Sequence, residues 1–300
     1  KGVRLINVGK RASHHTMPQE QINQVLAEEA KKGLRVVRLK GGDPFLFGRG
    51  GEELELLHKE GIPYEVVPGV TSPIAVPAYN GIPVTHRDFC SSLHIITGHK
   101  KKGDTYDIDF KALVNTKGTL VFLMGVSALE DICNSLLQAG MDEKMPAAIL
   151  QKGTTAGQKR IVATVSTLAE EVKKQGIETP AIIVVGKVCA LADEFAWYEK
   201  LPLFGCKVLV TRPKETISSM AHKLRLLGAE VLELPAIRTE PLEDQSLLKE
   251  ALKELDSYQW IAFTSPIGVK VFFDEMKQKY EALIRALDIM AQTLEQYHKD

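Results

Sequence analysis

The stretch from Arg35 to Gly51 constrains this 300-residue chain more than any other. A short run rich in β-branched residues, Arg35–Lys40, leads directly into a loop with five glycines, and an acidic, leucine-rich helix is predicted from Glu52 to His58. Glycine is favoured where the backbone approaches a ligand closely or adopts a positive φ. The pattern therefore predicts a strand-loop-helix unit whose loop binds a ligand at the carboxyl end of a strand.

The loop also carries Asp43, Pro44 and Arg49. Pro44 biases Asp43 away from the α-helical region, so we expect the Asp43 carboxylate to be held extended beside the ligand. An ordinary turn is the plainer interpretation, but the density of glycine and charge favours a ligand loop. No Gly-Lys-Ser/Thr sequence follows, so a phosphate-binding P-loop is not expected.

The charge balance of the chain argues against nucleic acid as a partner. Lys and Arg total 38, as do Asp and Glu, so the formal net charge is zero and no basic field favours nucleic acid. Any anionic ligand must be bound by local arginines. The length suggests about two domains, and 44% hydrophobic with 25% charged residues is typical of a globular protein with a core of normal size.

The cysteines and the apolar segments indicate a cytoplasmic protein. The four cysteines form no CxxC pair, and each lies in or beside an apolar stretch, which favours buried, reduced thiols: Cys90, Cys133, Cys189 and Cys206. No stretch has the apolar length of a membrane helix, and no signal-peptide pattern is present at the start.

Adjacent histidines, His14 and His15, raise the question of a metal site. Neighbouring side chains point apart, and no acidic or cysteine partner lies at ligand spacing. No metal is therefore expected.

Five strands are predicted in the first half of the chain, each followed by glycine and polar residues: 3–8, 35–40, 64–67, 93–99 and 119–125. We expect their carboxyl ends to form one edge of a sheet. Thr16 can cap a first helix. Thr71 and Ser72 could cap a second, short or kinked helix ending at Tyr79, or bind a ligand.

Beyond Met145 the pattern changes. Strands at 147–150, 158–165 and 181–188, with a helix between the second and third, predict a smaller sheet in a lobe of its own. A ligand could then bind between the two lobes. After a linker, 201–206, the strand-loop-helix pattern restarts: we predict strands at 207–213, 230–235 and 260–269, a helix at 217–227, and a helix cap at Thr264 and Ser265.

Six motifs, in order, resemble the uroporphyrinogen-III C-methyltransferases of the tetrapyrrole methylase family over residues 1–200. They are Gly9-Lys10-Arg11, Arg38 to Gly51, Val67-Pro68-Gly69-Val70-Thr71-Ser72, Gly81-Ile82-Pro83-Val84-Thr85-His86-Arg87, Thr97-Gly98-His99 and Gly153-Thr154-Thr155. The segment 207–300 resembles the first part of uroporphyrinogen-III synthase, on the strength of Val210-Thr211-Arg212-Pro213 and Phe263-Thr264-Ser265-Pro266-Ile267-Gly268-Val269.

The resemblance implies a fold, a reaction and an assembly. The fold is α/β: a two-lobed tetrapyrrole methylase, with a mostly parallel sheet and a smaller mixed sheet, followed by a partial α/β synthase-like domain. The reaction is methyl transfer from S-adenosylmethionine to two ring carbons of uroporphyrinogen III, giving precorrin-2 for siroheme and cobalamin. The assembly is a homodimer, and we expect no nucleic acid, membrane or metal among its partners.

The resemblance also assigns residues. Lys10 matches the proposed proton donor, while Arg38 and Arg49 match arginines near the substrate, which carries eight carboxylates suited to arginine. Eight residues should meet the cofactor: Gly41, Gly42, Asp43, Leu46, Thr71, Ser72, Met124 and Gly153. From the residues alone, Asp43 could equally be a loop cap and Lys10 a solvated lysine at a strand end.

The chain departs from the family pattern at both ends. The family begins with a further strand and a Gly-x-Gly-Pro-Gly-Asp loop, and the synthase segment lacks a second lobe, so we expect an internal fragment of a fused two-activity protein. Three alternatives stay open: a protein that acts chiefly as the synthase, a scaffold that binds tetrapyrrole or cofactor without turnover, and a methylase that acts on a corrin ring.

Overall fold

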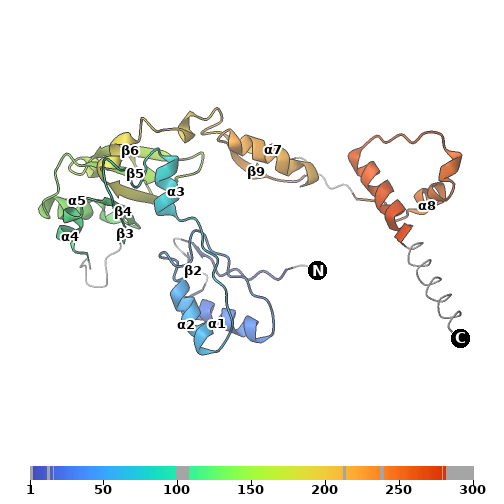
Figure 1. Ribbon diagram of the computed structural model, residues 1–300, viewed down its shortest axis with the longest axis horizontal. Coiled ribbons are helices and arrows are strands. Elements are labelled where there is room, and N and C mark those ends of the chain that lie inside the picture. Colours follow the sequence, from blue (N-terminus) through green and yellow to red (C-terminus); the bar gives the residue numbers. More distant parts are fainter. Residues whose placement is uncertain are drawn as a thin grey trace. The chain divides into compact units, whose positions relative to one another are not determined.

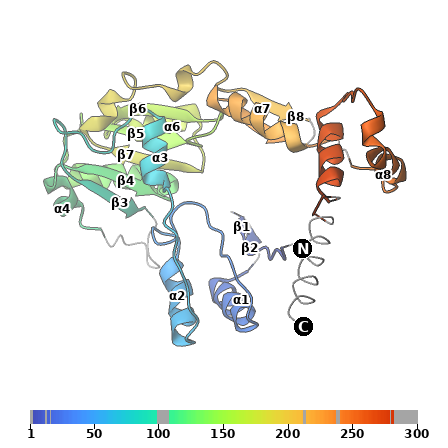
Figure 2. The same ribbon diagram turned by 45° about the vertical axis from the view of Figure 1, so that its right-hand side comes forward.

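The computed structural model describes residues 3–11, 14–15, 17–98, 108–211, 214–236, 240–278 and 280–281, and Figures 1 and 2 show its elements from two directions. The chain divides into two compact units. The first runs to Val208 and includes Leu224–Glu230; the second comprises Leu209–Lys223 and the chain from Val231. The predicted domain boundaries, with a linker at 201–206, stay predictions.

A five-stranded sheet forms the centre of the first unit, in the order β3-β4-β7-β5-β6. Its strands are β3 (Leu93–Thr97), β4 (Thr119–Leu123), β5 (Pro146–Gln151), β6 (Lys159–Thr164) and β7 (Ala181–Val185). Strands β3 and β4 are parallel, whereas the other neighbours are antiparallel. Ile149 of β5 lies in register between Ile183 and Ile161, which places three branched side chains on one face.

Alternate side chains of a strand point to opposite faces of the sheet, and both faces of this sheet carry a buried cluster. On one face Phe122, Ile149 and Ile183 pack with α5 (Leu129–Gln138), α6 (Leu168–Gln175) and α4 (Phe110–Asn115). On the other, Val121, Leu150 and Val184 pack with Val76 of α3 (Ser72–Tyr79). Each fully buried isoleucine contributes about 1.5–3 kcal/mol, so this double core makes the sheet a stable frame for a site.

The predicted helices before the sheet are confirmed as α1 (Gln19–Lys31) and α2 (Gly50–Lys59), which pack together. Thr16, the predicted cap of α1, lies outside the described residues. A short antiparallel pair precedes α1, formed by β1 (Lys10–Arg11) and β2 (His14–His15).

Three predicted strands are wrong: residues 3–8, 35–40 and 64–67 form no strand. Val37, Leu39 and Val67 are 79%, 84% and 74% exposed. The β-branched sequence favours an extended chain, but a strand also needs a hydrogen-bonded neighbour, and none pairs with these segments within the described residues. The expected single edge of five strand ends therefore reduces to the parallel ends of β3 and β4.

The strands β5, β6 and β7 do not form a lobe of their own, because β7 pairs with β4 and joins them to β3. Sequence periodicity predicts a strand but not its neighbour, which explains this difference. The predicted α/β class is confirmed, with a main sheet and smaller ones. The expectation of a mostly parallel sheet is wrong, because only one of the four strand pairs described for the main sheet is parallel.

Strands β8 (Lys207–Val210) and β9 (Glu230–Glu233) form a two-stranded sheet, and α7 (Lys214–Leu226) and α8 (Ser246–Lys253) are helices. The predicted strand at Trp260 is wrong, because the chain there is irregular and Trp260 is 91% exposed. A helix follows at 266–278, and the Ser265 hydroxyl accepts from the backbone N–H of Gly268 at 3.1 Å, as its predicted capping role requires.

Short 3₁₀ helices complete the description: η1 (Val126–Ala128), η2 (Lys187–Leu191), η3 (Tyr198–Lys200) and η4 (Leu255–Ser257). No helix in the described part has both the length and the apolar character needed to cross a bilayer. All four cysteines are free thiols; Cys133 and Cys189 are buried as predicted, but Cys90 is half-buried and Cys206 is exposed.

Candidate methyl-donor pocket

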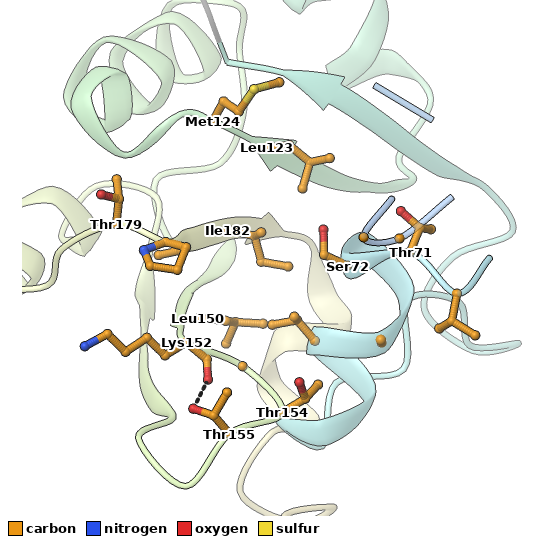
Figure 3. A pocket seen from close by; sticks show the side chains of 18 of the residues that line it. Thr71, Ser72, Leu123, Met124, Leu150, Lys152, Thr154, Thr155, Thr179 and Ile182 are labelled. Carbon is orange, nitrogen blue, oxygen red and sulfur yellow. Dashed lines mark hydrogen bonds between the residues drawn. The ribbon is translucent and has the colours of Figure 1, made fainter. Parts of the chain in front are cut away.

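A pocket of about 1010 Å³ lies in the first unit (Figure 3). Its walls come from the glycine loop, from α3 and the residues before it, from the ends of β4 and β5, and from the start of β7. The lining includes Gly41, Gly42, Asp43, Leu46, Phe47, Thr71, Ser72, Val76, Leu123, Met124, Leu150, Lys152, Gly153, Thr154, Thr155, Thr179 and Ile182.

All eight residues assigned to the cofactor lie in this lining: Gly41, Gly42, Asp43, Leu46, Thr71, Ser72, Met124 and Gly153. They come from four separate stretches of sequence. The structure thus brings them together, while their ligand stays a prediction.

The other assigned residues lie elsewhere. Arg38 donates from Nε to Glu53 at 3.2 Å, and Arg49 donates from Nε to Glu52 at 2.8 Å; neither lines the pocket. Lys10 belongs to β1, and its side chain is outside the described part.

The Asp43 carboxylate holds the glycine loop in shape. Its Oδ1 accepts from the backbone N–H of Phe45 at 2.8 Å and of Leu46 at 3.2 Å, and its Oδ2 accepts from that of Gly69 at 3.0 Å. The bonds from Gly69 and Phe45 are the main reason that the pKa of Asp43 lies below its usual value, so the group is ionised at neutral pH. Oδ2 accepts only one of these bonds and keeps a lone pair for a ligand, so the loop-cap and the ligand-binding interpretations remain compatible.

Close packing explains why the residues at positions 69 and 153 are glycines, Gly69 and Gly153. A Cβ on Gly69 would lie 2.3 Å from the carbonyl oxygen of Gly42, and one on Gly153 would lie 2.3 Å from Cγ1 of Val76. The first glycine lets the 68–70 segment touch the loop, and the second lets the turn after β5 touch α3.

Backbone strain is concentrated at the pocket. Among the described residues, six non-glycine residues have a positive φ, and four of them line the pocket: Phe47 (54°), Met124 (56°), Lys152 (47°) and Thr154 (69°). Such conformations persist only where the surroundings impose them, and they cluster at ligand sites. The strain therefore marks this pocket independently of any resemblance.

The predicted cap of α3 is not seen at Thr71. Thr71 is the N-cap residue, but its side chain makes no capping hydrogen bond, and Ser72 begins the helix. Of the two roles left open for Thr71, the structure supports a place on the pocket wall, where Figure 3 shows both residues.

A family comparison decides which proteins this chain belongs with. The model of the family described as tetrapyrrole (corrin/porphyrin) methylases matches residues 3–169, more than half of the chain. The chain is a tetrapyrrole methylase family member. A second model, of uroporphyrinogen-III synthase, matches residues 218–291 of this methylase family member.

Known relatives agree with this family. The chain is 52% identical over 274 residues to a porphyrin biosynthesis protein of Ruminiclostridium josui, covering 91% of this chain and 54% of that protein. It is 43% identical over 270 residues to the uroporphyrinogen-III C-methyltransferase of Bacillus subtilis, covering 89% and 55%. This tetrapyrrole methylase sequence thus spans about half the length of the curated relatives that it matches.

A solved structure extends the agreement to the fold. The uroporphyrin-III C-methyltransferase of Thermus thermophilus, in complex with S-adenosylhomocysteine, is 37% identical with a TM-score of 0.50. The match covers 57% of this tetrapyrrole methylase chain and 74% of that one.

Sequence reasoning missed part of the pocket of this tetrapyrrole methylase family member. Lys152, Thr154 and Thr155 line the wall after β5, and the Thr155 hydroxyl donates to the carbonyl of Lys152 at 2.8 Å (Figure 3). The Gly153-Thr154-Thr155 motif was the available signal, although only its glycine was assigned. The apolar floor from Val76, Leu150 and Ile182 gave no signal, because ordinary core residues have the same pattern.

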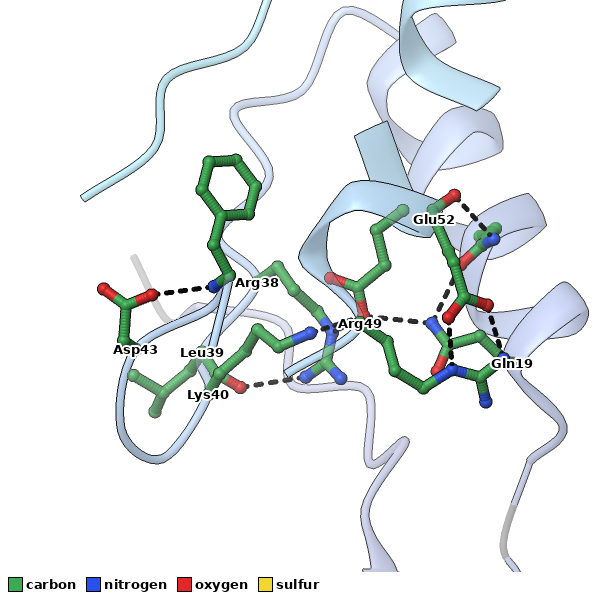
Figure 4. A network of polar contacts seen from close by, with 10 residues as sticks. Gln19, Arg38, Leu39, Lys40, Asp43, Arg49 and Glu52 are labelled. Carbon is green, nitrogen blue, oxygen red and sulfur yellow. Dashed lines mark hydrogen bonds and ion pairs between the residues drawn. The ribbon is translucent and has the colours of Figure 1, made fainter. Parts of the chain in front are cut away.

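Glu53 is a further residue that sequence reasoning missed. Only 5% exposed, it accepts from Lys40 at 2.8 Å, from Gln19 at 3.1 Å and from Arg38 at 3.2 Å. Burial alone would raise the pKa of Glu53, but the hydrogen bonds from Lys40 and Gln19 and the charges of Arg38 and Lys40 bring it below the usual value. Figure 4 shows the surrounding network, which joins the strand-like segment before the loop to α1 and α2.

Proposed function

We propose that the protein methylates uroporphyrinogen III at two ring carbons with S-adenosylmethionine, giving precorrin-2, and that the full-length protein also has uroporphyrinogen-III synthase activity. The observation that carries the proposal is the gathering of all eight assigned cofactor residues around one strained pocket, in a chain of the methylase family. The names of the Bacillus and Thermus relatives support this substrate and this methyl donor.

The residues present fit S-adenosylmethionine. The volume suits a small-molecule ligand, and the lining combines an apolar floor with a few hydroxyl and backbone groups, which is the usual composition of such sites. Gly41 and Gly42 present backbone without side-chain bulk, while Met124 and Gly153 lie on other walls. When bound, this molecule supplies an electrophilic methyl group on a sulfonium; the chain's own task is to hold donor and acceptor in line in a dry site.

Arg38 and Arg49 are proposed to bind carboxylates of the tetrapyrrole. The pair between Arg49 and Glu52 is exposed, with 45% and 48% of the two side chains accessible, and such surface pairs are worth about 0–1 kcal/mol. A substrate carboxylate could therefore replace Glu52 at low cost. The ion pair between Arg38 and Glu53 is more buried than the pair between Arg49 and Glu52, so Glu53 would keep Arg38 oriented toward the substrate.

Lys10 is proposed to act in proton transfer, because it matches the position of the proposed proton donor in the family. The proposal also includes a homodimer, which the family resemblance implies, and a cytoplasmic location, which the cysteines and the apolar segments of the sequence indicate.

Product analysis of the full-length protein tests this function. Incubation with S-adenosylmethionine and uroporphyrinogen III should yield a product with two added methyl groups. A cyclised product from linear hydroxymethylbilane without any methylation would instead favour a protein that acts chiefly as the synthase. Binding of both ligands without turnover would favour a scaffold, and failure of uroporphyrinogen III to compete with a corrin substrate would favour a corrin methylase.

A further inference from the structure

The turn between β5 and β6 is a strained wall of the pocket. Lys152 has φ 47° and Thr154 has φ 69°, and both residues line the pocket. For a β-branched residue such as Thr154, the left-handed region is a genuine outlier. The surrounding structure must therefore hold this turn in place.

A buried glutamine holds it. Gln158 is 5% exposed, and its Oε1 accepts from the backbone N–H of Thr154 at 2.9 Å. The carbonyl of Thr154 accepts from the hydroxyl of Tyr198 at 3.4 Å. Both backbone groups of the strained residue are thus bound by side chains, one from Gln158 at the end of the same turn and one from Tyr198, 44 residues further along the chain.

The same glutamine connects two walls of the pocket. Its Nε2 donates to the carbonyl of Tyr79 at 3.1 Å and to the Glu199 carboxylate at 3.1 Å. Tyr79 is the last residue of α3, whose first turn lines the pocket at Ser72. One buried amide therefore fixes both the turn after β5 and the far end of the helix against which Gly153 packs.

We propose that Gln158 is a positioning residue for the methyl-donor pocket. It does not line the pocket; it acts through Thr154 and Tyr79 to set the shape of the wall and its distance from α3. The inference rests on the proposed function for the identity of the ligand, but the holding role can be measured in the ligand-free protein.

The test compares Gln158→Ala with Gln151→Ala. Gln151 is a matched control: it lies in β5 of the same hairpin, is also 5% exposed, and donates to the carbonyl of Glu178 at 2.9 Å without lining the pocket. Loss of either buried amide should lower the melting temperature, so stability alone does not separate the two variants.

Two readouts separate them. In the absence of ligand, amide hydrogen exchange of the 152–157 peptide should be faster in Gln158→Ala and unchanged in Gln151→Ala. Affinity for S-adenosylhomocysteine should fall by about tenfold in Gln158→Ala, the effect of one lost buried hydrogen bond, and by less than about threefold in the control. In the methylation assay the KM for the methyl donor should rise in Gln158→Ala, while kcat at saturating donor is retained.

Unchanged exchange of the 152–157 peptide in Gln158→Ala would overturn the inference, as would equal losses of affinity in the two variants. A wild-type protein that binds no S-adenosylhomocysteine would instead refute the methyl-donor pocket. The exchange result then decides separately whether Gln158 holds the turn.

Discussion

Lys40 donates to the buried carboxylate of Glu53 across 2.8 Å, and this ion pair joins the residue before the glycine loop to the first turn of α2. Only 11% of the Lys40 side chain and 7% of the Glu53 side chain are exposed. Gln19 of α1 donates to the same carboxylate. Glu53 thus ties three segments together in a region where no main-sheet strand does so.

Replacing Glu53 should reveal how much this connection contributes. Glu53→Gln leaves Lys40 without its counter-charge, and we expect a loss of about 2–3 kcal/mol in the free energy of unfolding, measured with denaturant. The neighbouring Glu52→Gln is the control, because its carboxylate pairs at the surface with Arg49 and the change should be within about 0.5 kcal/mol. Equal effects of the two substitutions would contradict this role of Glu53.

The stability provided by Glu53 should depend on pH with a defined sign. Its folded-state pKa is below the ordinary value of 4.5, so its contribution is fully present above pH 4.5 and is lost as the pH falls through the folded pKa. We expect the gap in unfolding free energy between wild type and Glu53→Gln to be constant from pH 7 to 5 and to shrink below about 4.5. A gap that widens on acidification would show that the pKa is raised instead.

Gly153 should tolerate no side chain while Val76 faces it. In Gly153→Ala the new methyl group meets Cγ1 of Val76, so we expect a loss of about 1–3 kcal/mol in unfolding free energy. Gly157→Ala in the same turn is the control, since its Cβ would lie no closer than 3.6 Å to any neighbour. The double variant Gly153→Ala/Val76→Ala should lose less free energy of unfolding than the two single variants lose together. A loss equal to that sum would argue against the contact.

Local sequence patterns were sufficient for α1, α2, α3, α6 and α7 and for the strands of the main sheet, whereas α4, α5 and α8 were not predicted. The apolar spacing of α1 and the continuous apolar run of β4 each specify their structure within one segment. The extended segments at 3–8, 35–40 and 64–67 carry strand-like residues, but strand formation depends on a neighbour that local sequence does not encode. The joining of β7 to β4 was missed for the same reason.

The pocket was predicted from motifs rather than from geometry. Gly41, Asp43 and Met124 were assigned through the family resemblance, and their common place on the wall was visible only after folding. The left-handed backbone of Lys152 and Thr154 could not be predicted, because the side-chain hydrogen bonds that hold Thr154, from Gln158 at the end of the turn and from Tyr198 44 residues further along, are visible only in the folded chain. The pairing of Arg38 with Glu53 likewise needed the structure.

The most direct test of the pocket is calorimetric titration of S-adenosylhomocysteine into this chain and into Asp43→Ala. Asp43 holds the backbone N–H groups of Phe45, Leu46 and Gly69, so its loss should release the loop that forms one wall. We predict clear binding by the wild type, weakened by at least about tenfold in the variant, the effect of losing one or two charge-assisted hydrogen bonds. Absence of binding by the wild type, or equal binding by both proteins, would contradict a methyl-donor site built on this loop.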